Sequence, residues 1–99
     1  MNRGTSGEEF PLGSAQRGLW RLMLKLPALR GAIQVLNAKT TTLASLCEAY
    51  EDSCVTLQRL RANPFEANSS MVEEYETICL EIEADVIQYC IEHRGNVPD

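Results

Sequence analysis

Apolar residues recur along three segments of the chain at alternating spacings of three and four positions, which places their side chains on one face of an α-helix. In residues 14–37, this face consists of Leu19, Leu22, Leu26, Leu29, Ile33 and Leu36. In residues 40–62, this face consists of Leu43, Leu46, Tyr50, Ser53, Leu57 and Leu60, and Ser53 is its one small polar residue. In residues 71–93, it consists of Val72, Tyr75, Cys79, Ile82, Val86 and Tyr89. The pattern predicts an all-α protein.

Pro27 interrupts the first of these segments. Inside a helix, proline removes a backbone hydrogen bond and clashes with the preceding turn, at a cost of about 3 kcal/mol. We therefore expect a kinked N-terminal segment or two short helices, 14–26 and 28–37. Ser14 suits the N-cap position of the first piece.

The ends of the other two helices carry their own signals. The threonines at 40–42 offer N-caps, and Pro64 ends that helix because the residue before a proline disfavours the α region. Ser70 followed by Glu73 is a capping-box pattern, and Gly95 suits the position just after a helix.

The second and third segments are expected to pack as an antiparallel helical hairpin, about 40–62 against 71–93, because a short loop makes consecutive helices antiparallel neighbours. Sliding the two apolar faces together pairs Leu57 with Tyr75 and Tyr50 with Ile82. The same register places Cys54 near Cys79, and Arg59 and Arg61 near the acids at 73, 74 and 76.

A second apolar stripe follows the third helix away from this seam, formed by Leu80, Ala84, Ile87 and Ile91. A helix that is apolar on two sides is expected to be buried on two sides. Either the N-terminal segment covers this stripe, in a three-helix-bundle-like domain over residues 14–95, or a second chain does. We favour both, with a dimer that forms through remaining apolar surface around Trp20, Met23 and Leu24. Residues 1–13 and 96–99 are expected to be tails.

Charge divides unevenly over the 99 residues, whose net charge is −5. Residues 1–46 hold six basic residues against two acidic ones, and residues 47–99 hold three against twelve. An acidic half repels phosphates, which argues against nucleic-acid binding. The simplest interpretation is that the basic half packs against the acidic half, in the same chain or in a partner.

Four cysteines offer the first candidate chemistry: Cys47, Cys54, Cys79 and Cys90. None forms the closely spaced pair that zinc sites favour, so we interpret them as reduced core thiols of a cytoplasmic protein. A thiol- or metal-responsive sensor remains the alternative. No catalytic motif, phosphate loop or cofactor motif is present. We therefore expect no enzyme activity, no cofactor and no metal.

The segment 14–26 offers the second candidate feature. Arg17, Arg21 and Lys25 form a basic stripe opposite leucines, which is also typical of a helix lying on a membrane surface. We favour packing on its own domain or on a partner. The predicted function is a protein–protein interaction module, such as an adaptor, a regulator or an antitoxin-like inhibitor, that binds a partner or dimerises. Its expected interaction surface consists of Trp20, Met23, Leu24, Leu80, Ile87 and Ile91.

Overall fold

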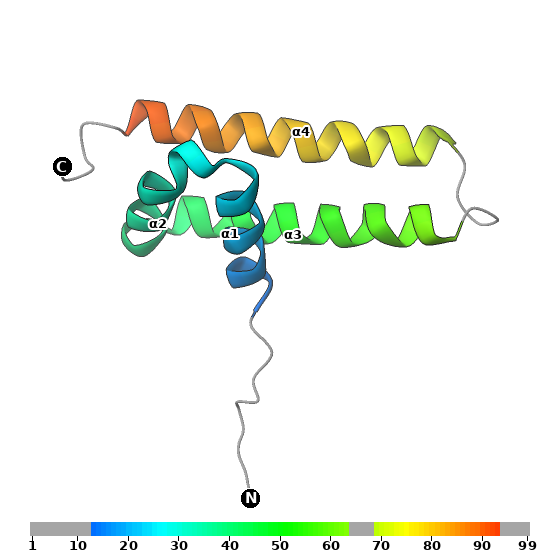
Figure 1. The fold of residues 1–99 in the computed structure, drawn as a ribbon, viewed down its shortest axis with the longest axis horizontal. Helices are drawn as coiled ribbons and strands as arrows, with labels where there is room; N and C mark the ends of the chain where they lie inside the picture. Colours follow the sequence, from blue (N-terminus) through cyan, green and yellow to red (C-terminus); the bar gives the residue numbers. More distant parts are fainter. Residues whose placement is uncertain (1–12, 64–68, 94–99) are drawn as a thin grey trace, which may run out of the picture.

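The computed structural model describes residues 13–63 and 69–93, and these residues fold entirely into helices and their connections (Figure 1). The elements are α1 (Ser14–Lys25), a 3₁₀ turn η2 (Pro27–Leu29), α2 (Arg30–Lys39), α3 (Thr41–Ala62) and α4 (Ser69–Glu92). The all-α prediction is confirmed. The predicted tails lie outside the described residues apart from Gly13, as does the Gly95 cap.

The predicted antiparallel hairpin is formed by α3 and α4, which run side by side in Figure 1. Its register is confirmed by two contacts between the helices. The sulfur atoms of Cys54 and Cys79 lie 4.0 Å apart, and the hydroxyl of Tyr50 donates a 2.6 Å hydrogen bond to Glu83. Each contact lies within one residue of a predicted pair.

The far end of the hairpin carries an ion pair between Arg61 and Glu76, whose nitrogen and oxygen atoms lie 2.5 Å apart. The two side chains are 56% and 43% exposed, so the pair contributes about 0–1 kcal/mol. It agrees with the predicted proximity of the arginines of α3 to the first acids of α4.

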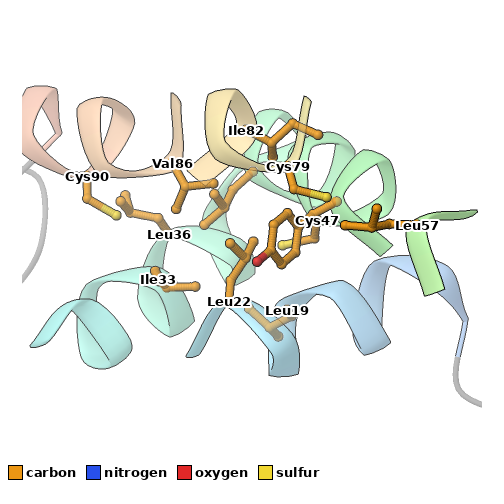
Figure 2. Close-up of a cluster of buried hydrophobic side chains, with 12 residues drawn as sticks. Leu19, Leu22, Ile33, Leu36, Cys47, Leu57, Cys79, Ile82, Val86 and Cys90 are labelled. Carbon is orange, nitrogen blue, oxygen red and sulfur yellow. The ribbon is translucent and has the colours of Figure 1, made fainter. Parts of the chain in front are cut away.

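The core gathers where α1 and α2 pack against the hairpin (Figure 2). Its fully buried side chains come from all four helices and are Leu22, Ile33, Leu36, Leu43, Cys47 and Val86. Leu57 and Ile82, which the hairpin prediction requires to be buried, are buried as well. The predicted apolar seams of α3 and α4 therefore form the centre of the domain.

The first helix crosses α3 steeply instead of running alongside it (Figure 1). The crossing point is at Gly18, where an added Cβ atom would lie 1.8 Å from the backbone oxygen of Cys47. No side chain fits between backbones this close, so only glycine permits the approach. The absence of a side chain at Gly18 thus sets how deeply α1 packs.

The predicted break at Pro27 is confirmed. The first helix ends at Lys25, Leu26 adopts a non-helical conformation, and Pro27 begins η2, where its missing N–H costs nothing. The chain then continues as α2, which lies at the end of the hairpin where α3 begins and α4 ends (Figure 1).

Thr40 separates α2 from α3 and serves both helices. Its backbone N–H donates to Leu36 of α2 at 2.9 Å, and its side-chain oxygen accepts from the N–H of Leu43 in α3 at 3.4 Å. The threonine cap predicted from the sequence is confirmed. A single extended residue ends one helix and begins the next.

Two other predicted helix starts are wrong. The first helix already includes Ser14, and extended Gly13 takes the N-cap position, where its carbonyl accepts from the N–H of Arg17. The fourth helix begins at Ser69, so Ser70 lies inside the first turn and cannot cap it. In both cases the chain enters the helix earlier than the polar side chain suggested, a common error at helix ends.

The prediction that the N-terminal helices cover the second apolar stripe of α4 is also wrong. Leu80, Ala84 and Ile91 are exposed, and Ile87 is half-buried. The N-terminal helices do not cover this face, because α1 packs mainly on α3 and α2 contacts α4 only at the end of the hairpin. The core of the domain forms without this stripe, which faces the solvent.

Candidate functional site

The six residues predicted to form an interaction surface fall on two outward-facing stripes. On α1, the side chains of Trp20 and Leu24 lie one turn apart and are 50% and 76% exposed. Met23 beside them is half-buried and packs against the core. With Arg30, these three residues line a hollow of about 300 Å³. The structure therefore brings the predicted α1 residues together.

The α4 residues of the predicted surface lie along one face of that helix. Leu80 and Ile91 are 62% and 53% exposed, and half-buried Ile87 lies between them. Exposed large apolar side chains gathered on one surface mark interaction sites more often than singly scattered ones do. The two stripes are thus comparable candidates on different helices.

A groove joins the two stripes across the middle of the molecule. One hollow of about 390 Å³ reaches Leu80, and a neighbouring one of about 330 Å³ reaches Leu24. The two hollows share Lys25, Tyr50 and Cys54 in their lining. Leu24 and Leu80 therefore flank a continuous surface that the sequence pattern alone did not connect.

Tyr50 and Glu83, which line this groove, are paired across α3 and α4. Burial, together with the hydrogen bond to Glu83, raises the pKa of Tyr50 well above its ordinary value. The phenol therefore stays protonated and acts as a hydrogen-bond donor. This arrangement fixes α3 against α4 and gives Tyr50 no role as a base.

All four cysteines are free, and they divide into two environments. Cys47 and Cys90 are sealed in the core, and burial raises the pKa of both thiols, that of Cys47 to about 11. Cys54 and Cys79 face each other at the groove. Burial also raises the pKa of Cys79 to about 11. The described residues contain no group of three or more potential ligands that could hold a metal ion.

A buried carboxylate lies at the crossing of α1 and α3. Glu51 is only 3% exposed, and it accepts a 3.0 Å hydrogen bond from Nε of Arg17 and a 2.5 Å one from Nε of Arg21. Burial alone would raise the pKa of Glu51, but the bonds from Arg21 and Arg17 outweigh it and hold the pKa below its ordinary value. The carboxylate is therefore ionised and joins the two helices.

The role of Glu51 was not predicted from the sequence, although two signals pointed to it. Glu51 lies between Cys47 and Cys54 on a helix face that turned out to be partly buried. Arg17 and Arg21 are one helical turn apart, the spacing at which two guanidinium groups reach one acid. The predicted packing of the basic half on the acidic half is seen here within a single chain.

In the described part of the chain, no helix has the length and apolar character needed to cross a lipid bilayer.

Comparisons of this chain with known protein families, curated proteins and solved structures find no match.

Proposed function

We propose that the protein is a small, non-catalytic helical module that binds another protein, as an adaptor, a regulator or an antitoxin-like inhibitor would. The observation that carries the proposal is the exposure of Trp20, Leu24, Leu80 and Ile91 on helices whose opposite faces already complete a core. A folded monomer gains nothing from these four side chains in solvent, whereas a partner that covers them gains their apolar area.

The charge of α4 indicates what kind of partner fits the stripe there. The helix contains seven carboxylates and neither lysine nor arginine. Of the seven, Glu76 pairs with Arg61 and Glu83 accepts from Tyr50. A partner that lays an apolar face on Leu80 and Ile91 is therefore favoured when basic residues flank that face.

Two further aspects belong to the same proposal. A second copy is a possible partner, and a dimer would then bury the α1 surface. Free thiols are typical of the cytoplasm, where we place the protein. We do not propose binding to a membrane surface, because two of the three cations of the basic stripe of α1 bond Glu51.

The test compares four versions of the full chain as bait in affinity capture from native cells: the wild type, Leu24→Asp, Leu80→Asp and the control Ala49→Asp. Ala49 is exposed on α3 and lines none of the hollows described above. A charge placed in an apolar contact is expected to reduce partner recovery by roughly tenfold or more, while the control retains the partner. Sedimentation velocity of the same four proteins shows whether the partner is a second copy.

Identical recovery and identical sedimentation for all four proteins would overturn the proposal. Circular dichroism of each variant confirms that the helices are intact, so that a loss of binding is not a loss of folding.

A further inference from the structure

Two potentially reactive side chains from different helices meet where Cys54 contacts Cys79. Their sulfur atoms are 4.0 Å apart, both thiols are free, and both line the groove between α3 and α4. A disulfide has its sulfur atoms about 2.05 Å apart. Forming the bond requires the two sulfur atoms to approach by about 2 Å, through rotation of the side chains about their Cα–Cβ bonds and any helix movement still needed.

The two thiols differ in their access to solvent. Cys54 is half-buried and lines both hollows of the groove, whereas Cys79 is buried. Arg21 and Lys25 line the hollow that contains Cys54. Glu76 and Glu83 line the other hollow, which both cysteines line together with Lys25 and Arg61.

We propose that Cys54 and Cys79 form an oxidation site, in which hydrogen peroxide converts the two thiols into a disulfide between α3 and α4. The sulfur of Cys54 attacks a peroxide oxygen, the O–O bond breaks, and water leaves to give a sulfenic acid. The sulfur of Cys79 then attacks the sulfur of Cys54, the S–O bond breaks, and a second water leaves. Two thiols lose two electrons and two protons in total, and one peroxide becomes two waters.

The remaining cysteines do not compete for this role. Cys47 and Cys90 are 0% and 3% exposed, so an oxidant reaches them only when the core opens. The site is therefore selective for a single pair of cysteines. It does not depend on the proposed binding function, although the disulfide would lie in the surface that connects Leu24 to Leu80.

A bond between positions 54 and 79 would join the helices of the hairpin and restrict the unfolded chain. Disulfides that close loops of this size stabilise proteins mainly through that restriction. The oxidised protein is expected to melt at least about 5 °C above the reduced protein. Reduction by a dithiol reverses the change through thiol–disulfide exchange.

The experiment treats the fully reduced, full-length protein with hydrogen peroxide at a few equivalents, blocks free thiols with an alkylating reagent, and maps the products by mass spectrometry. The expected product is a monomer lighter by two hydrogen atoms, with a peptide cross-link between Cys54 and Cys79 and with Cys47 and Cys90 alkylated after denaturation. In Cys79→Ala, the sulfenic acid on Cys54 should persist long enough to be trapped by a cyclic 1,3-diketone.

A matched control, Cys90→Ala, should form the same cross-link as the wild type. The proposal is overturned if the wild type gives sulfinic acid, disulfides between chains, or a cross-link between any other pair in place of the bond between Cys54 and Cys79. The wild-type result decides the matter even if a variant fails to fold.

Discussion

Replacing Gly18 with alanine is expected to lower the free energy of unfolding by about 3 kcal/mol or more, at or beyond the upper end of the usual cost of overpacking. The added Cβ atom would lie 1.8 Å from the backbone oxygen of Cys47 and 2.6 Å from its carbonyl carbon. Neither atom belongs to a flexible side chain, so the clash is relieved only if α1 moves away from α3. That movement opens the core around Leu19 and Leu22.

Gly31→Ala is the matched control for this experiment. Gly31 lies in α2 and is exposed, and apart from its chain neighbours and the backbone of its own helix no atom lies within 4 Å of the position of an added Cβ. Alanine is the better helix former, so this variant should be more stable than the wild type by about 0.5 kcal/mol. Chemical denaturation of both variants measures the two changes. Equal effects of the two substitutions would mean that α1 and α3 do not meet at Gly18.

Replacing both Arg17 and Arg21 with methionine is expected to destabilise the protein by about 3 kcal/mol at pH 7, because it leaves the ionised carboxylate of Glu51 buried without a partner. The expected loss of stability lies at the lower end of the range usual for a broken buried ion pair, because both arginines are about one third exposed or more and water screens their charges. Methionine keeps much of the apolar packing of the arginine stems.

The pH dependence gives this prediction a specific signature. In the wild type, the folded-state pKa of Glu51 lies below its unfolded value. Its contribution is therefore complete above the unfolded pKa and is lost as the pH falls through the folded one. In the double variant, burial is the only remaining influence on the carboxyl group of Glu51. Protonation of this group therefore removes the free-energy cost of burying its charge. The stability difference between the two proteins should therefore begin to shrink above the ordinary Glu pKa of about 4.3, as the carboxyl group of the variant protonates, and should shrink further as the pH falls through the lowered pKa of the wild type.

A triple variant that adds Glu51→Leu to the double variant tests whether the unpaired carboxylate causes the loss of stability. Replacing a buried ionic cluster with apolar residues of similar size is often neutral or stabilising, so the triple variant should recover most of the loss and show no pH-dependent difference from this group. Denaturation from pH 3 to pH 8 measures all three proteins. A double variant as stable as the wild type at pH 7 would contradict the assigned role of the arginines.

The elements and the hairpin register could be predicted from the sequence because both depend on local spacing. The heptad-like faces of α3 and α4 contain the information needed to align Cys54 with Cys79. A proline such as Pro27 predicts a break in any helix whose interior contains it. These features need only the period of the helix and the chemistry of single residues.

The placement of α1 could not be predicted in the same way. Its angle to α3 depends on Gly18, and a glycine indicates a close approach only once the opposing backbone is known. The burial of Glu51 depends in turn on that angle, because an acid is rarely buried without partners and its partners lie 30 and 34 positions away. With α1 turned across α3, the stripe from Leu80 to Ile91 remained uncovered.

The shared role of Thr40 has a mechanical consequence. Because Thr40 alone connects α2 to α3, no loop separates these helices. We therefore expect the two helices to move as one unit. Motion of α1 relative to α2 must instead occur at Leu26 and Pro27, where the helical hydrogen bonding is interrupted. Any rotation of α1 relative to α2 would therefore occur about this joint, and it would have to break the close packing of α1 on α3 at Gly18.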